Sequence, residues 1–175
     1  MYKLTITRKV YNGHGVFGEL TVPSCEGLTQ SYTTVEREQV PEDWRKLTPT
    51  QRLRYCMPCG AYSVKYMFDG DLKPYFYIQG QSSWKPMFFT GNNEKKANTI
   101  RVGTDASPDG SIIGGKEVMA DLSDLLQEYM TYGFIPYTPR YGLFVLEIVE
   151  ADDYHEGDFA SDGADAYLQH FDPDV

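Results

Sequence analysis

Apolar and polar residues alternate along most of the chain, which is the pattern of β-strands that bury one face. The first two alternating runs, Lys3–Val10 and Val16–Val22, flank Asn12-Gly13, a strong signal for a hairpin turn. The remaining predicted strands are Ser31–Glu38, Gly60–Phe68, Tyr75–Gln79, Pro86–Thr90, Thr99–Val102 and Leu143–Val149. The chain is therefore expected to be mainly β, with one antiparallel or mixed sheet or barrel.

One segment, Lys116–Tyr132, has the period of an α-helix instead. Its apolar residues recur at intervals of three and four, so they share one face of the predicted helix; they are Val118, Leu122, Leu125, Leu126 and Tyr129. Gly133 follows at the position of a C-terminal cap. We expect this to be the principal helix, packed by that face against the sheet.

Residues 41–55 interrupt the strand pattern with two short helical signals. In the second, Thr48 stands where an N-cap is favoured and Pro49 occupies the first helical position. The predicted organisation is therefore a single β domain over residues 1–149, with a helical insertion at 41–55, followed by a C-terminal tail over 150–175.

Charge separates this tail from the rest of the chain. The 175 residues carry a net charge of −9 from 16 Lys and Arg and 25 Asp and Glu. Nine of the acidic residues lie in Glu150–Val175, which contains no Lys or Arg, so the preceding residues are neutral. Nucleic acid is not expected as a partner, because binding the phosphate backbone requires a basic surface.

Four aromatic residues are spaced among the acids of the tail: Tyr154, Phe159, Tyr167 and Phe171. They suit a segment that docks on a basic or apolar groove of a partner, although acidic composition alone favours a solvated extension. Asp158, Asp162 and Asp165 lack the spacing of an EF-hand loop. No metal and no cofactor are therefore predicted.

The sequence shows no signal for export or membrane insertion. The apolar run Gly142–Val149 is too short to span a bilayer and contains a Glu, so no membrane partner is expected. The N-terminal residues enter a strand pattern directly, without the features of a signal peptide. We expect synthesis in the cytoplasm, which is compatible with a final place in a virion.

Three cysteines, Cys25, Cys56 and Cys59, are too few for a disulfide scaffold. Cys56-Met57-Pro58-Cys59 has the spacing of a redox pair, but such a pair opens a helix, whereas a strand pattern follows here. Structural thiols are favoured over redox chemistry.

The segment DGSIIGGKE, from Asp109 to Glu117, has the glycine and lysine spacing of a phosphate-binding loop. Such a loop follows a parallel strand directly and places a hydroxyl beside its Lys to bind magnesium. Here Glu117 stands at the hydroxyl position, and the predicted strand Thr99–Val102 ends several residues earlier. Nucleotide binding is therefore kept only as a second alternative function.

The order of four short landmarks resembles an uncharacterised family of small phage and bacterial proteins, which is itself similar to the L,D-transpeptidase (YkuD-type) catalytic domain. The landmarks are SYTTVE at 31–36, MPCGAY at 57–62, FFTGN at 88–92 and GSIIGG at 110–115. The resemblance extends over residues 3–149. It implies a transpeptidase-like β fold with a cell-wall peptide groove.

The resemblance also implies where catalysis would occur. In that enzyme family a Cys attacks a peptide carbonyl and a His takes its proton. Ser111 stands at the position of the Cys and Phe89 at the position of the His. Because a phenyl ring accepts no proton and a serine without a base is un-ionised, loss of catalysis is expected, with Ser111 as the one candidate for residual activity.

A groove without its catalytic pair can still bind. The candidate binding residues are Tyr77, Trp84, Phe89, Thr90, Gly91 and Asn92, although strand alternation favours the core for most of the aromatic ones. The favoured function is a non-catalytic structural or interaction protein, phage-encoded and part of a virion or another assembly. Its partners would be other protein subunits, including copies of itself. A peptidoglycan-binding or residually active cell-wall protein is the first alternative.

Overall fold

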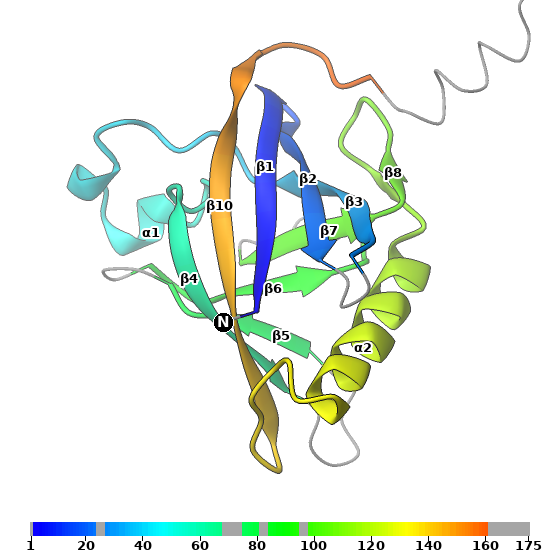
Figure 1. The fold of residues 1–175 in the computed structure, drawn as a ribbon. Helices are drawn as coiled ribbons and strands as arrows, with labels where there is room; N and C mark the ends of the chain where they lie inside the picture. Colours follow the sequence, from blue (N-terminus) through cyan, green and yellow to red (C-terminus); the bar gives the residue numbers. More distant parts are fainter. Residues whose placement is uncertain (1, 24–26, 68–74, 81–83, 95–97, 161–175) are drawn as a thin grey trace, which may run out of the picture.

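The computed structural model describes residues 2–23, 27–67, 75–80, 84–94 and 98–160. Eight strands close into a barrel in the order β1-β10-β4-β5-β6-β7-β3-β2 (Figure 1). Their bounds are β1 (Lys3–Asn12), β2 (Gly15–Pro23), β3 (Thr29–Glu36), β4 (Gly60–Met67), β5 (Tyr75–Ile78), β6 (Met87–Thr90), β7 (Thr99–Gly103) and β10 (Tyr141–Glu156). The prediction of a single-domain, mainly β fold with one principal helix is confirmed.

The barrel is mixed, because β1 lies parallel to β10 and β6 parallel to β7, while the other pairs are antiparallel. The hairpin at Asn12-Gly13 forms as the turn signal predicts. Closure pairs the first strand with the last and leaves the sheet without a free edge. The pairing of β3 with β7 is short, from Thr33 opposite Gly103 to Val35 opposite Arg101.

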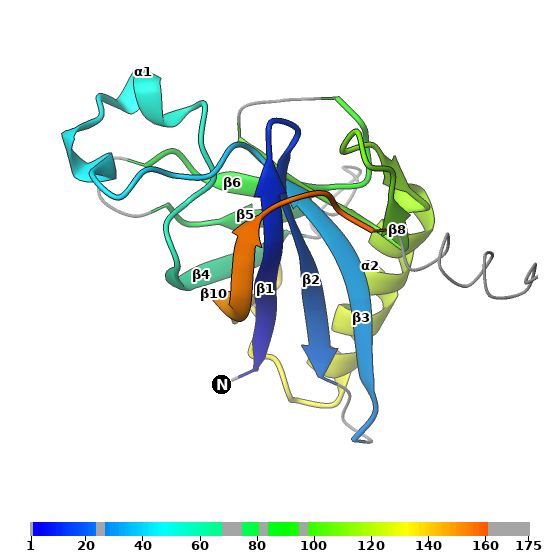
Figure 2. The ribbon, with the colours of Figure 1, turned by 90° about the horizontal axis from the view of Figure 1, so that it is seen from above.

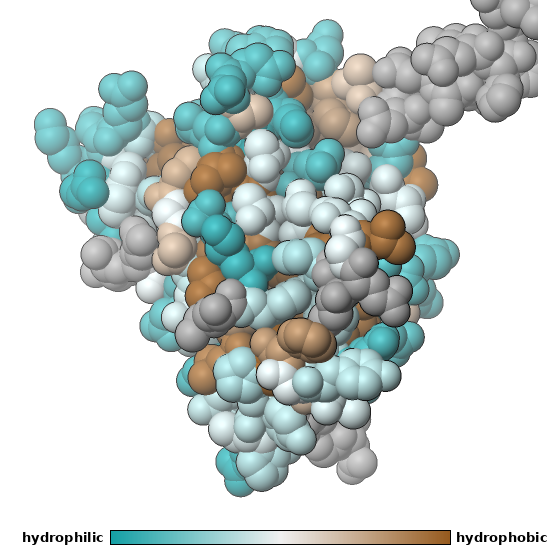
Figure 3. Space-filling view, in the orientation of Figure 1, coloured by the Kyte–Doolittle hydropathy of each residue, from teal (hydrophilic) through white to brown (hydrophobic). Residues whose placement is uncertain are grey.

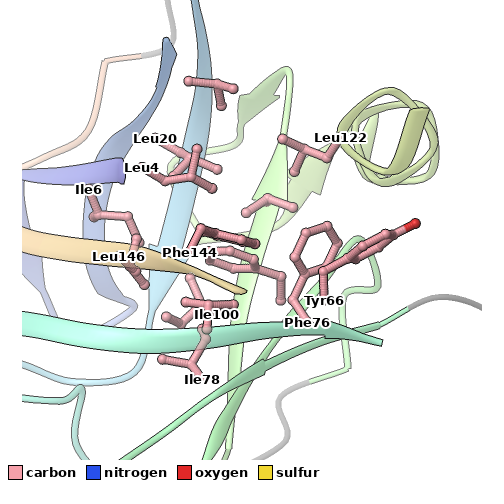
Figure 4. Packing of buried hydrophobic residues seen from close by; sticks show 14 of the residues in the cluster. Leu4, Ile6, Leu20, Tyr66, Phe76, Ile78, Ile100, Leu122, Phe144 and Leu146 are labelled. Atoms are coloured by element: carbon pink, nitrogen blue, oxygen red, sulfur yellow. The ribbon is translucent and has the colours of Figure 1, made fainter. Parts of the chain in front are cut away.

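Inward-facing positions of the strands fill the barrel with apolar side chains, as the alternation predicts. Leu4 and Ile6 of β1 meet Phe76 and Ile78 of β5 and Phe144 of β10 in this core (Figure 4). The principal helix, α2 (Gly115–Thr131), contributes Val118, Leu122, Leu126 and Tyr129 to the same cluster. Its amphipathic face therefore completes the barrel core.

A second, smaller cluster lies outside this core, where Phe17, Val35, Ala106 and Ile112 are buried together. The two-stranded sheet of β8 (Asp105–Ala106) and β9 (Ile112–Ile113) supplies two of these residues. Strands of two residues give no periodicity, so the alternation did not predict this sheet. It holds the segment around Ser111 close to β7.

The insertion predicted at 41–55 contains a 3₁₀ turn, η1 (Trp44–Lys46), and the short helix α1 (Pro49–Arg52). Thr48 caps α1 by accepting a hydrogen bond from the Gln51 backbone N–H, and Pro49 takes the first helical position. Figure 1 and Figure 2 place the insertion and α2 on opposite sides of the barrel. None of the described helices has the length and apolarity that crossing a bilayer requires.

The last strand is longer than the predicted Leu143–Val149, because β10 continues to Glu156. Its final residues pair with β1 after a bulge between Arg8 and Val10, so the start of the acidic segment belongs to the barrel wall. Alternation ends near Glu150, where the charged residues begin, which explains why the strand pattern stopped there.

Candidate functional site

Two segments from the sequence landmarks meet at the start of α2. The amide of Asn93 pairs with the backbone of Ile112 in both directions, with N–O distances of 2.6 and 3.1 Å. The backbones of Gly91 and Gly115 also touch, since a Cβ on Gly91 would lie 2.3 Å from the Gly115 carbonyl oxygen. The structure therefore joins the TGNN segment at 90–93 to the loop that contains Ser111, and Asn93 is a joining residue that the sequence prediction missed.

Ser111 lies half-buried in this loop. Its backbone N–H donates to Asp109 Oδ1 at 3.0 Å, and its carbonyl accepts from the Ser107 N–H at 2.8 Å. No hydrogen bond joins its hydroxyl to any side chain within the described ranges. Phe89 is buried on β6 and packs edge-on against Phe76 with ring centroids 5.4 Å apart. The surroundings of Ser111 therefore provide no bonded general base in the described part of the chain.

The start of α2 is packed against protein. Gly114 precedes the helix with a left-handed φ of 70°, and its neighbour Gly115 is covered by the backbone of Gly91. Lys116 and Glu117 lie in the first turn, where the carboxylate suits the helix dipole and the ammonium opposes it. A phosphate at the Gly115 amide would require Gly91 to move, so the packing argues against a phosphate cradle here.

The aromatic candidates for a binding face lie mostly in the interior. Trp84 is 7% exposed and packs edge-on against Trp44 of the insertion, with ring centroids 5.7 Å apart. Tyr77 is half-buried and contacts Phe88 at 5.6 Å. A recess of about 230 Å³ beside β6 is lined by Phe89, Thr90 and Asn92 together with Phe88, Glu94, Asn98 and Thr99. Three of the six predicted binding residues therefore share one recess, while Trp84 serves the core.

A buried ion pair, absent from the predicted sites, crosses the barrel interior. Arg8 Nε donates to Glu36 Oε1 at 2.9 Å and Arg8 Nη2 to Glu36 Oε2 at 2.8 Å, with neither side chain exposed. Arg8 Nη2 also donates to the Met57 carbonyl at 2.6 Å. Burial is the largest influence on the pKa of Arg8 and lowers it, but the charge and hydrogen bonds of Glu36, together with the nearby Cys56 and Cys59, outweigh burial and raise that pKa well above its ordinary value. Arg8 follows Leu4 and Ile6 at every second position of β1, so the alternation places its side chain on the inward face. This sequence signal for a buried arginine was missed.

The thiols beside this pair are poor nucleophiles. Burial raises the pKa of Cys56 to about 12, and burial also raises the pKa of Cys59, although Arg8 opposes it in both cases. Cys59 Sγ lies 3.6 Å from Arg8 Nη1 and is otherwise exposed. Both described cysteines are free thiols, and Cys25 lies outside the described residues. Their environment favours the structural interpretation over redox chemistry.

Two tail residues pack on the barrel. The Tyr154 hydroxyl donates to Gln39 Oε1, and burial raises the pKa of Tyr154. Phe159 stacks on Phe17 with ring centroids 4.8 Å apart and planes 9° from parallel. The other two predicted tail residues, Tyr167 and Phe171, lie outside the described residues. Among the described residues, His, Cys, Asp and Glu form no group of three that could hold a metal ion.

The turn between α2 and β10 lies at the end of the barrel opposite the tail residues Tyr154 and Phe159. It exposes three aromatic side chains to solvent. Tyr132, Phe134 and Tyr137 are 67%, 52% and 59% exposed, and we call them the aromatic turn. Its backbone is fixed, because the N–H groups of Phe134 and Ile135 both donate to the Tyr129 carbonyl. The sequence prediction ended the helix correctly near Gly133 but assigned no role to this turn.

Comparisons with protein-family models, with curated proteins and with solved structures returned no match.

Proposed function

We propose that the protein is a non-catalytic structural or interaction protein that assembles with further copies of itself through the aromatic turn. The observation that carries this proposal is the exposure of Tyr132, Phe134 and Tyr137 on one short, fixed segment. Tyr, Trp and Phe are enriched at the cores of protein interfaces, and Trp and Tyr are, with Arg, the residues most often found to dominate the binding free energy. Figure 3 shows a mostly hydrophilic face on which apolar residues lie in separate patches. Large exposed apolar side chains gathered on one segment are typical of interaction sites.

The turn is prepared for docking because it does not need to be ordered first. Ile135 is 1% exposed and anchors the turn in the core, while the Pro136 carbonyl accepts from the Leu143 N–H at 2.9 Å. Tyr129 supports the Phe134 ring edge-on at 6.3 Å. A surface held in its bound shape loses little conformational entropy on association, which favours affinity.

A second copy is a suitable occupant on grounds of charge. Residues 131–139, TYGFIPYTP, contain no charged side chain, so two identical turns meet without like-charge repulsion. The acidic segment leaves the body from the other end of the barrel, beyond Glu156 (Figure 1). Because a twofold interface brings the same surface together from both copies, a neutral aromatic surface is self-complementary in charge.

The resemblance to the phage and bacterial family supplies the wider setting of this proposal. On the strength of that resemblance, the proposal includes a degenerate L,D-transpeptidase-like fold and a role in a virion or another assembly. The loss of catalysis is supported by the buried phenyl ring of Phe89 at the position of the base and by the absence of a bonded base on Ser111 in the described ranges. Detection of the chain in purified particles by mass spectrometry tests the setting.

The assembly itself is tested by sedimentation equilibrium over a wide range of protein concentration. The full chain is expected to populate dimers or larger oligomers, and the triple variant Tyr132→Ser, Phe134→Ser, Tyr137→Ser is expected to be monomeric. Leu28→Ser is the matched control, because Leu28 is 71% exposed but does not belong to the aromatic turn. A wild-type chain that stays monomeric at the highest concentration contradicts the proposal.

A further inference from the structure

The recess of about 230 Å³ beside β6 combines an aromatic ring with two side-chain amides. Phe88 of β6 lines it together with Thr90, Asn92 and Asn98. The Phe88 N–H donates to the Asn98 carbonyl at 2.8 Å, and Thr90 Oγ1 accepts from the Asn92 N–H at 3.2 Å. The backbones of both asparagines are therefore tied to β6, and the ring and the two amides keep a fixed arrangement.

The two side-chain amides have hydrogen-bonding capacity for a ligand. Asn92 is exposed and Asn98 is half-buried. Neither side chain forms a hydrogen bond within the described ranges of the chain. Each amide offers two N–H donors and a carbonyl acceptor. A ligand whose groups donate and accept at once, as hydroxyl groups do, uses both capacities of each amide.

Phe88 also belongs to a group of aromatic rings on the outer wall of the barrel, and we call Tyr75, Tyr77 and Phe88 the aromatic rim. Tyr77 lies opposite Phe88 in the β5–β6 pair, with ring centroids 5.6 Å apart and planes at 78°. Tyr75, on the same face of β5, lies 6.0 Å from Phe88 at 52° and is 38% exposed. Rings at such angles give a planar base no flat surface for stacking, whereas the C–H groups of a puckered sugar ring pack against tilted rings.

The strands beside the recess are not open to an added peptide strand. Phe88 pairs with Tyr77 of β5 on one side and with Thr99 of β7 on the other. Because the described strands close into a barrel, β6 has no unpaired edge that a peptide could extend. Ligand contacts in the recess must come from side chains, which suits a ligand rich in hydroxyl groups better than an extended peptide.

We propose that the recess and the aromatic rim bind a neutral oligosaccharide. One sugar ring packs against Phe88 and exchanges hydrogen bonds with the amides of Asn92 and Asn98, and the next ring along the chain lies against Tyr75 or Tyr77. The volume of the recess suits a single sugar ring, so the rim accommodates the rest of the ligand. Strand faces of other small barrels serve as oligosaccharide sites.

The test is saturation-transfer-difference NMR of the full chain with cellotriose, maltotriose and triacetylchitotriose, followed by titration of each trisaccharide that binds. We expect at least one to bind. Phe88→Ala should weaken binding by about tenfold, the cost of losing one aromatic contact. Asn92→Ala and Asn98→Ala should weaken it by about two- to tenfold each, the cost of one hydrogen bond. Leu28→Ser, which removes an exposed apolar side chain outside the recess, should leave the affinity unchanged.

Three results would overturn the proposal: no binding of any trisaccharide, equal binding by the wild type and by the double variant Asn92→Ala, Asn98→Ala, or tighter binding of a thymidine trinucleotide than of every trisaccharide. If Phe88→Ala fails to fold, the asparagine variants still test the site, because their side chains form no hydrogen bond within the described ranges. The result is independent of the assembly experiment. The triple variant of the aromatic turn keeps the recess and should bind the trisaccharide as the wild type does, and a monomeric wild type that binds it would contradict only the assembly.

Discussion

The buried pair of Arg8 and Glu36 should be among the most sensitive points of the fold. Arg8 is fully buried and donates two hydrogen bonds to the Glu36 carboxylate and one to the Met57 carbonyl. Glu36→Gln removes the negative charge and one of the two side-chain acceptors, while the Arg8 charge stays buried. Two unit charges about 4 Å apart at an effective dielectric constant of about 20 attract each other by ~4 kcal/mol. Breaking a buried pair by removing one partner costs about 3–5 kcal/mol, which agrees with that value.

The assay is urea unfolding followed by circular dichroism, with a lower free energy of unfolding expected for Glu36→Gln. Glu38→Gln is the matched control, since its partner Arg54 is exposed and the loss of that pair should stay within experimental error. Arg8→Met combined with Glu36→Leu should recover most of the loss, because two apolar groups leave no unpaired buried charge.

If Glu36→Gln lowered the free energy of unfolding by less than about 1 kcal/mol, this reasoning would be refuted, because the ion pair would then not be isolated from water. A double variant as unstable as the sum of its single variants would refute it as well. In that case the cost would come from packing at each position rather than from the coupling between the two charges.

Two further predictions concern the glycine contact and the thiols. Gly91→Ala should lower the stability by about 1–3 kcal/mol and the melting temperature by several degrees, because its Cβ would lie 2.3 Å from the Gly115 carbonyl oxygen. Gly13→Ala, which meets nothing within 4 Å, should melt almost as the wild type does, and equal melting of all three chains would contradict the contact. In a Cys25→Ser background, a thiol reagent at neutral pH should leave Cys56 unlabelled and modify exposed Cys59 slowly, because burial raises both pKa values and the thiolates form only as the pH rises. Rapid labelling of Cys56 in the folded chain at neutral pH would contradict its burial.

The barrel was predictable because most strands have one buried and one exposed face, which gives the alternation directly. The same reasoning identified the hairpin at Asn12-Gly13, the cap at Thr48 and the amphipathic face of α2. It could not give the order of the strands, since the pairing of β1 with β10 joins residues that are far apart in the chain. It also missed the last residues of β10, from Glu150 to Glu156, where charged residues mask the alternation of a strand.

The candidate sites were less predictable, because they depend on contacts between distant segments. The third and fourth landmarks do meet, but through Asn93 and the backbones of Gly91 and Gly115. A recess lined by Arg37 and Arg101 lies where β3 and β7 stop pairing, and no local sequence pattern encodes such a divergence of two strands. The aromatic turn had a visible signal in TYGFIPYTP, a run of large side chains beyond a helix end.

The central claim, assembly of a non-catalytic protein through the aromatic turn, is tested most directly by sedimentation equilibrium of the full chain. The account predicts oligomers whose population rises with concentration in the wild type and in Leu28→Ser. It predicts a folded monomer when Tyr132, Phe134 and Tyr137 are all replaced by Ser. A monomeric wild type, or a triple variant that assembles as the wild type does, would contradict it.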